Sequence, residues 1–407
     1  MYILQQFRLC SLLVLAFTVQ AVAGDHPVRS EFECATVRGC VNERPVQLLI
    51  DTGAVKCGLD VRVRKALGVK VLSEMTVSAP SGTVSIPVCE PIHLTIDKYP
   101  VRSVEPVQLD LQMLTSMGLF GIEGIVGRDA LSHHVVVISD GTVSILDSVP
   151  PRFEVIQKQT FKRADSNVAS LPVFIPTLEG QQVTLEIDTG STEACRFKES
   201  VIASLKANRQ IVTGLSQRGS DVKGVVNGTS FILREIIVAG VRFRNVRVTS
   251  ARNNAIGLEL LRHLNLALDF PQRQIVIAKP AKDVVDHFPQ NASGMGIRFD
   301  AADNLKVLAV RPDGPAEGAG IRIGDIVLML DSRNPVELSI YEVDDIVAQN
   351  GRTIPVRLRR DSAEFTVDLP LKLPFEYPPN WASLDKEQAD FEEFLRKQDN
   401  DASERPK

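Results

Sequence analysis

The sequence contains the triplet Asp-Thr-Gly twice, at residues 51–53 and again at residues 188–190. A single such triplet is typical of an ordinary turn, because aspartate bonds its own backbone and glycine accepts a positive φ. Two copies indicate more, because two carboxylates about 3 Å apart cannot both ionise and therefore share one proton. The ionised partner can take a proton from water while the protonated partner polarises a carbonyl. Asp51 and Asp188 are therefore candidates for hydrolysis that needs neither a metal nor a covalent nucleophile.

The residues that follow each aspartate suit the support of a carboxylate. A threonine hydroxyl can brace the loop, and a glycine lets the backbone turn tightly and donate N–H bonds to the carboxylate. The fourth residue is alanine in one copy and serine in the other, and only serine can donate a side-chain hydrogen bond toward the pair. Six residues are expected to support the two aspartates: Thr52, Gly53, Ala54, Thr189, Gly190 and Ser191.

An internal repeat surrounds the two triplets. Residues 46–54 match residues 183–191, and in both segments apolar residues alternate before the aspartate, which predicts a strand with one buried face. Further along, residues 124–131 match residues 255–261, each with an apolar pair followed by glycine. A repeat of this kind supplies two equivalent loops, as a shared carboxylate pair requires.

These motifs resemble the retropepsin family of aspartic proteases. Residues 51–54 together with residues 125–131 are similar to the retroviral protease pattern. Residues 188–191 together with residues 255–257 are similar to the same pattern, with the serine also seen in pepsins. Retroviral enzymes are homodimers of one such unit, whereas here both units lie in one chain, as in pepsin.

The resemblance covers residues 31–147 and 169–280 and implies a function for particular residues. It implies that Asp51 and Asp188 are catalytic and that Gly127 and Gly257 lie in segments that support the catalytic loops from behind. It also implies a glycine-bearing hairpin that closes over a peptide or protein substrate. The candidates for such flaps lie in two polar stretches: Ser81, Gly82, Gly219 and Ser220.

The last third of the chain has a different pattern. A predicted strand at residues 305–310 precedes a glycine-rich run at residues 314–330, and a predicted helix at residues 338–349 precedes strands at residues 354–359 and 364–369. This order resembles a PDZ domain of the bacterial protease-associated type. The resemblance implies that protein C-termini bind as an added strand, with the carboxylate on backbone N–H groups. The implied peptide-binding residues are Gly294, Met295, Gly296 and Ile297. The alternative is a structural PDZ domain that binds nothing.

The amino-terminal residues have the pattern of a signal peptide. Arg8 precedes an apolar run at residues 9–19, and an Ala-Val-Ala cleavage pattern occupies residues 21–23. We expect an exported protein, periplasmic or extracellular, with no transmembrane span, because the run is short for a bilayer. Cleavage would leave an odd number of cysteines, and the oxidising compartment would allow Cys34 and Cys40 to staple a hairpin.

Composition excludes several functions. Hydrophobic residues form 44% of the chain, enough for packed cores, and the net charge of −4 comes without a dense Lys/Arg block. Nucleic-acid binding therefore has no electrostatic basis. The six histidines are scattered without carboxylates at ligand spacing, so neither a metal nor another cofactor is expected.

The expected fold is mainly β: two retropepsin-like β-barrel lobes that form a pseudo-two-fold aspartic protease, followed by an α+β PDZ domain. Two alternatives remain: a catalytically silent peptide-binding protein with a degenerate protease fold, and a site assembled between chains. The predicted divisions are a signal peptide at 1–23, lobe 1 at 24–147, a linker at 148–168, lobe 2 at 169–280, a linker at 281–291, the PDZ domain at 292–373 and a charged tail at 374–407.

Overall fold

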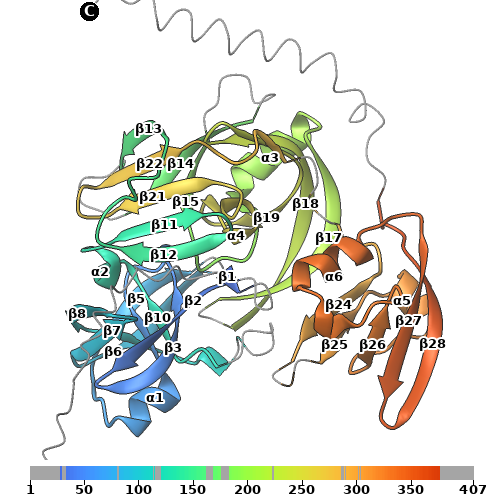
Figure 1. Cartoon of the computed structure of the whole chain (residues 1–407), viewed down its shortest axis with the longest axis horizontal. Coiled ribbons are helices and arrows are strands. Elements are labelled where there is room, and N and C mark those ends of the chain that lie inside the picture. The colour runs from blue at the N-terminus through green and yellow to red at the C-terminus, as the bar shows by residue number, and fades with distance from the viewer. Residues whose placement is uncertain are drawn as a thin grey trace, which may run out of the picture.

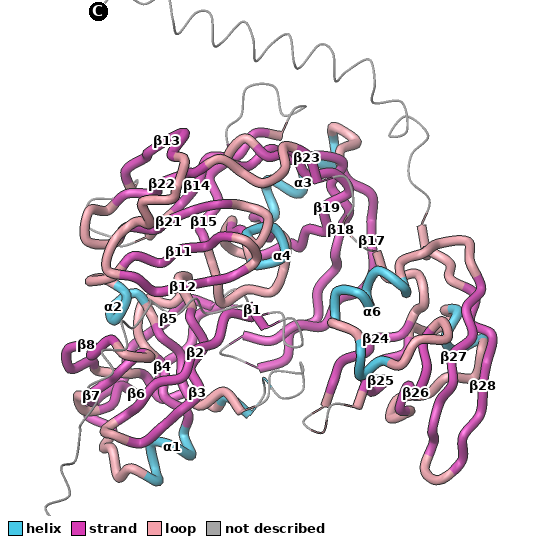
Figure 2. Tube along the Cα trace, viewed as in Figure 1, coloured by secondary structure: helices cyan, strands magenta, loops and turns pink. Residues whose placement is uncertain are grey.

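The computed structural model describes most of the chain between residues 28 and 375. The described residues are 28–29, 34–79, 82–112, 114, 121–161, 168–175, 183–221, 224–285, 288, 290–300, 302 and 304–375. Strands dominate every part of this structure (Figures 1 and 2), which confirms the mainly β fold class. The predicted signal peptide and the tail beyond residue 375 lie outside the described residues.

The first lobe is built on one strongly curved sheet of ten strands. Its order is β5-β6-β9-β4-β10-β3-β2-β7-β8, with β1 paired to β2. The predicted strand before Asp51 is present, and its alternate apolar side chains are buried. The elements are β1 (Val28–Arg29), β2 (Cys34–Val41), β3 (Arg44–Ile50), β4 (Gly58–Asp60), α1 (Val61–Ala66), β5 (Val71–Ala79), β6 (Gly82–Cys89), β7 (Ile92–Ile96), β8 (Tyr99–Val104), β9 (Val107–Leu109), β10 (Gly124–Val126) and α2 (Arg128–Leu131).

The second lobe repeats this plan in a sheet of eight strands. Its order is β17-β18-β14-β15-β20-β16-β19-β23, and β15 pairs in parallel with β20 as β3 pairs in parallel with β10. The sequence repeat therefore has a structural counterpart. The elements are β14 (Ser170–Phe174), β15 (Val183–Ile187), β16 (Cys195–Lys198), α3 (Glu199–Ala207), β17 (Ile211–Asp221), β18 (Gly224–Val238), β19 (Val241–Ala251), β20 (Ala255–Ile256), α4 (Leu258–Leu261) and β23 (Val284–Val285).

A third sheet joins the two lobes. Its order is β12-β11-β21-β22-β13, and β11 from the first half pairs antiparallel with β21 from the second. One hydrophobic core extends through both lobes and this inter-lobe sheet. The lobes are thus held by main-chain hydrogen bonds as well as by packing. The strands are β11 (Val135–Ser139), β12 (Thr142–Leu146), β13 (Val155–Thr160), β21 (Asn265–Asp269) and β22 (Gln274–Ala278).

Three expectations about connections and cysteines were wrong. The predicted linker at 148–168 contains β13, an edge strand whose mostly exposed side chains leave no apolar alternation in the sequence. The predicted linker at 281–291 contains the short strand β23, which pairs with β19. Cys34 and Cys40 lie on one strand, β2. Six residues of extended strand span about 20 Å, far beyond the reach of a disulfide.

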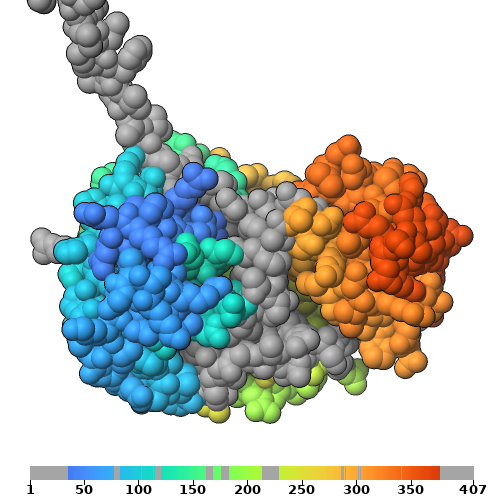
Figure 3. Space-filling model, turned by 90° about the horizontal axis from the view of Figure 1, so that it is seen from below, coloured from blue at the N-terminus to red at the C-terminus, as the bar shows by residue number. Residues whose placement is uncertain are grey.

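The PDZ domain has its own sheet and its own core. Its strands follow chain order, β24-β25-β26-β27-β28, so β24 and β28 are the edges. Ser339 and Glu342 form a capping box at the start of the predicted helix. The domain lies to one side of the lobes (Figures 1 and 3). The elements are β24 (Met295–Phe299), β25 (Leu305–Val310), α5 (Pro315–Gly318), β26 (Ile326–Leu330), the 3-10 helix η2 (Pro335–Glu337), α6 (Ile340–Val347), β27 (Thr353–Arg360) and β28 (Ala363–Pro370).

Within the described part of the chain, no helix has the length and apolar character to cross a membrane.

The inter-lobe sheet offers a matched test of what holds the lobes together. Ile138 is fully buried on β11, whereas Ile156 on edge strand β13 is 54% exposed. Ile138→Ala should lower the free energy of unfolding by about 2–4 kcal/mol, because it leaves a cavity in the shared core. Ile156→Ala should change it by less than about 0.5 kcal/mol. Urea unfolding followed by circular dichroism measures both, and equal losses would contradict the shared core.

Candidate active site

The two Asp-Thr-Gly loops meet between the lobes and bond to each other reciprocally. Each threonine hydroxyl accepts a hydrogen bond from the other threonine's backbone N–H, at 3.1 Å in both directions. Each hydroxyl also donates across the lobes, Thr52 to the carbonyl of Ile187 at 2.7 Å and Thr189 to the carbonyl of Ile50 at 2.8 Å. Both threonines are buried. These four bonds lock the ends of β3 and β15 together.

The aspartates accept hydrogen bonds from their own loops. Oδ1 of Asp51 accepts the N–H groups of Gly53 at 2.9 Å and Ala54 at 2.8 Å, and Oδ1 of Asp188 accepts that of Gly190 at 3.1 Å. Burial within the protein, followed by the negative charge of Asp188, raises the pKa of Asp51 to about 7. Asp51 thus holds a proton at a pH where an ordinary aspartate is ionised.

The glycines explain how closely the two carboxylates approach. A Cβ atom added to Gly53 would lie 2.6 Å from Cγ of Asp188, and one added to Gly190 would collide with the carboxylate of Asp51. Each carboxylate therefore packs on the glycine of the opposite loop. Any larger residue at either glycine would push the pair apart.

The segments at Gly127 and Gly257 lie behind the loops, where the sequence predicted support. The N–H of Asp51 donates to Val126 at 3.0 Å, and that of Asp188 donates to Ile256 at 3.0 Å. A side chain at either glycine would meet main-chain atoms of the adjacent catalytic loop, since a Cβ on Gly127 would lie 2.5 Å from the carbonyl carbon of Lys56. Close backbone approach is thus the reason for glycine at both places.

The residue after each support glycine also bonds the catalytic loop through its backbone, but the two residues differ in their side chains. The N–H of Arg128 donates to Ala54 at 2.9 Å, and the N–H of Leu258 donates to Ser191 at 2.8 Å. The Arg128 guanidinium is buried and donates at 2.8 Å to Glu186 on β15, the strand that ends just before Asp188. An ion pair therefore ties the support segment of lobe 1 to the catalytic strand of lobe 2.

Cys57 and Cys195 occupy equivalent positions behind the two loops. The N–H and thiol of Cys57 donate to Asp129 at 2.9 and 3.1 Å. Burial, together with nearby carboxylates, raises the pKa of both thiols. Neither cysteine suits a nucleophile, which requires a thiolate near neutral pH.

Two hairpins contain the flap candidates Gly82, Gly219 and Ser220. The strands β5 and β6 pair as far as Ala79 and Gly82. The strands β17 and β18 pair as far as Asp221 and Gly224. Ser81 lies outside the described residues.

The predicted position of the second flap tip was wrong by a few residues. Gly219 and Ser220 lie inside β17, where they pair with Val226 and Val225. Glycine and polar residues usually indicate a turn, but here they continue an antiparallel ladder whose hydrogen bonds come from the backbone alone.

Arg196 is the residue at this site that sequence reasoning missed. Its guanidinium bonds Oδ2 of Asp188, and its Nε donates to Oδ1 of Asn253 at 3.2 Å. Ser191, expected to donate from its side chain, instead contributes through its main chain. When the two halves of the sequence are aligned with Cys57 opposite Cys195, Arg196 falls opposite Gly58. This difference between the halves would have identified Arg196.

Of the four residues predicted to bind a carboxylate, Gly294 ends the loop before β24, and Met295, Gly296 and Ile297 begin that strand. Gly294 has a positive φ of 75°. The N–H groups of Gly294 and Met295 donate within the loop, to Asn291 at 3.2 Å and to Ser293 at 3.1 Å. Gly296 and Ile297 follow on β24, an edge of the sheet. An edge strand is the place where a peptide strand could add.

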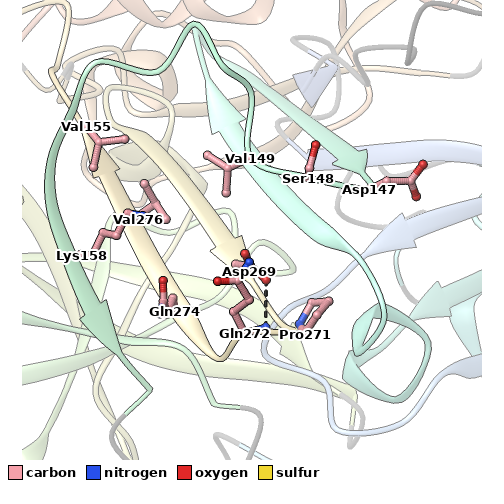
Figure 4. Close-up of a pocket in the computed structure, with 10 residues that line it drawn as sticks. All are labelled: Asp147, Ser148, Val149, Val155, Lys158, Asp269, Pro271, Gln272, Gln274 and Val276. Atoms are coloured by element: carbon pink, nitrogen blue, oxygen red, sulfur yellow. Dashed lines mark hydrogen bonds between the residues drawn. The ribbon is translucent and has the colours of Figure 1, made fainter.

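Two surface hollows lie away from the aspartates. The larger, about 330 Å³, lies on the inter-lobe sheet (Figure 4), and its lining includes Asp147, Lys158 and Gln272. The smaller, about 280 Å³, is lined by Pro100, Val101, His133 and His134. Neither includes a residue of the Asp-Thr-Gly loops. Among the residues the structure describes, no three His, Cys, Asp or Glu side chains are grouped so as to hold a metal ion.

Comparison with known families agrees with this geometry. The aspartyl protease family model matches residues 37–129, and the PDZ domain model matches residues 306–360. Residues 37–129 thus match an aspartyl protease domain, and residues 306–360 match a PDZ domain. The predicted resemblance is thereby confirmed.

Each curated relative is similar to about a fifth of the chain. Serine endoprotease DegS of Escherichia coli (strain K12) is 37% identical over 92 residues, which cover 22% of this chain and 24% of DegS. DegS of Escherichia coli O157:H7 gives the same values. Serine protease HTRA1 of Xenopus tropicalis is 30% identical over 91 residues, or 22% of this chain and 17% of HTRA1. The chain thus spans about a quarter or less of the length of these relatives.

The reciprocal threonine bonds predict a stability difference between two close variants. Thr52→Val keeps the side-chain shape but removes the hydroxyl, which leaves the carbonyl of Ile187 and the N–H of Thr189 buried without a partner. Each such group costs about 1–3 kcal/mol, so the loss of both should lower the free energy of unfolding by about 2–6 kcal/mol. Thr52→Ser restores both bonds and should lose less than about 1 kcal/mol. Equal losses in urea titrations would contradict the interlocked loops.

Proposed function

We propose that the chain is an aspartic endopeptidase in which Asp51 and Asp188 act together on one water molecule. The observation that carries this proposal is the interlocked pair of loops, which brings two carboxylates together by the reciprocal bonds of Thr52 and Thr189. The raised pKa of Asp51 supports it, because the pair then holds one proton up to about neutral pH. A pair with one proton contains both an acid and a base.

The chemistry follows from this single proton. The ionised carboxylate takes a proton from the water as the water oxygen bonds to the scissile carbonyl carbon. The protonated carboxylate gives its proton to the carbonyl oxygen, which yields a neutral gem-diol. In the second step one carboxylic acid protonates the amide nitrogen, the other carboxylate takes a hydroxyl proton, and the carbon–nitrogen bond breaks. The pair returns to its starting state with one proton.

The relatives support proteolysis in general, since DegS and HTRA1 are serine proteases by name. Their similarity extends over about 90 residues. The aspartic type proposed here therefore rests on the two carboxylates and on the aspartyl protease match at residues 37–129. We further propose that the PDZ domain recruits protein C-termini and that the chain is exported by way of residues 1–23.

One observation favours the alternative of a silent peptide-binding protein. The guanidinium of Arg196 bonds one oxygen of Asp188, and this ion pair is not part of the Asp-Thr-Gly motif. Cleavage of casein or of a peptide library, inhibited by pepstatin, would support the peptidase. Binding of peptides without any cleavage would support the alternative.

Each aspartate should be needed for activity. Asp51→Asn and Asp188→Asn should each reduce kcat/KM for peptides by at least about 10³-fold, because neither amide can exchange protons with water or substrate. Unfolding in urea checks that both variants keep the fold. An equimolar mixture of the two should stay inactive if both aspartates act within one chain. Recovered activity on mixing would instead favour a site assembled between chains.

Removal of the PDZ domain should separate chemistry from recruitment. Both aspartates lie outside that domain, and its core is separate from that of the lobes. A truncation after residue 290 should keep kcat/KM for short peptides within about threefold of the full chain and lower the cleavage of particular protein substrates. Assays with both substrate types measure this, and complete loss of peptide cleavage by a folded truncation would make the PDZ domain part of the active unit.

A further inference from the structure

Arg196 lies on β16 directly beside Asp188 and is almost fully enclosed. Its side chain is 13% exposed and that of Asp188 is 9% exposed. One guanidinium nitrogen bonds Oδ2 of Asp188, while Oδ1 of Asp188 accepts the N–H of Gly190. The Nε donates to Asn253 at 3.2 Å, which fixes the plane of the guanidinium. The arginine is therefore a built part of the site.

The first lobe has no equivalent of this arginine. Arg196 pairs with Ala255 on β20, and the corresponding pair in lobe 1 joins Gly58 with Ile125 on β10. A Cβ added to Gly58 would lie 2.5 Å from a methyl carbon of Leu109, so no side chain fits there without movement. The carboxylate of Asp51 is accordingly bound by backbone N–H groups, whereas that of Asp188 is also bound by a guanidinium.

Other charges near the pair have partners of their own. Glu186 on β15 is paired with Arg128 of α2 at 2.8 Å, and Glu193 accepts the hydroxyl of Thr249 on β19 at 2.8 Å. Burial opposes the charge on Arg196, but the negative charges of Asp188 and of these glutamates raise its pKa, so it stays a cation. Asp51 is the titratable group that faces Asp188 across the pair.

We propose that Arg196 is a positioning residue: its guanidinium pairs with Asp188, so that the single proton of the pair lies on Asp51. This inference rests on the proposed peptidase function and assigns roles that two-fold symmetry alone leaves open. Asp188 takes the proton of the attacking water, and Asp51 gives its proton to the carbonyl oxygen. In the second step Asp188 protonates the leaving nitrogen and Asp51 recovers a proton from the gem-diol, which restores the starting state.

The pH dependence of kcat/KM tests this role. Arg196→Gln removes the charge but keeps an N–H donor, so the acid limb of the profile, which belongs to the carboxylate pair as a whole, should move to higher pH by about one unit or more. The basic limb of the profile should also move to higher pH, because the loss of a positive neighbour also disfavours ionisation of both carboxylates. Arg196→Lys keeps the charge, and its acid limb should stay within about 0.5 units of the parent.

Arg247→Gln provides the matched control. Arg247 lies in the same lobe but pairs with Glu259 at 3.3 Å, so its loss should leave both limbs in place. If Arg196→Gln fails to fold, Asn253→Ala removes the anchor of Nε and should shift the acid limb upward by a smaller amount. Unmoved limbs in the folded Arg196→Gln variant, or in Asn253→Ala in its place, would overturn the inference.

Two outcomes separate this inference from the proposed function. An inactive parent protein, or activity that survives loss of both aspartates, contradicts the peptidase itself. A parent that needs both aspartates, with limbs unmoved by Arg196→Gln, contradicts only the role of the arginine. A variant that gains kcat at every pH without a shift of either limb also overturns the inference, because Arg196 would then obstruct substrate instead of setting the charge.

Discussion

The structure depends on the reciprocal bonds between Thr52 and Thr189. Each hydroxyl serves the other lobe: it satisfies a backbone N–H of the opposite loop and the carbonyl just before the opposite aspartate. Neither lobe can satisfy these buried groups alone, and an unpaired buried group is costly. Correct docking of the lobes and assembly of the carboxylate pair are therefore one event. The shared core and the pairing of β11 with β21 supply the apolar energy and the alignment that this event needs.

Glycine and charge then determine what the docked loops can do. The loop glycines allow each carboxylate to approach the opposite loop, and the glycines behind the loops allow the support segments to approach the backbone. Once together, the carboxylates are buried and like-charged, and both effects raise the pKa of Asp51 to about 7. The arrangement that stabilises the lobes thus creates an acid that keeps its proton near neutral pH.

Much of this could be predicted from sequence because it depends on local pattern. Alternating apolar residues before each aspartate predicted β3 and β15. The resemblance to retropepsins implied the segments at Gly127 and Gly257 behind the loops, which follow β10 and β20. Features that depend on backbone pairing were harder to predict from the sequence. The side chains of β13 are mostly exposed and show no apolar alternation. The β17–β18 hairpin extends past Gly219, which was predicted to lie at its tip. Arg196 was missed because its partner is eight residues away in sequence but adjacent only after β16 folds back behind the loop.

The difference between Arg196 and Gly58 has a consequence for the architecture as a whole. In a symmetric homodimer every residue occurs on both sides of the axis, so an arginine beside one aspartate requires an arginine beside the other. Two such cations would favour ionisation of both carboxylates and remove the shared proton. Two halves in one chain escape this constraint, because each half can change alone. The chain keeps two-fold symmetry where the loops interlock and breaks it where charge is set, at the position equivalent to Gly58.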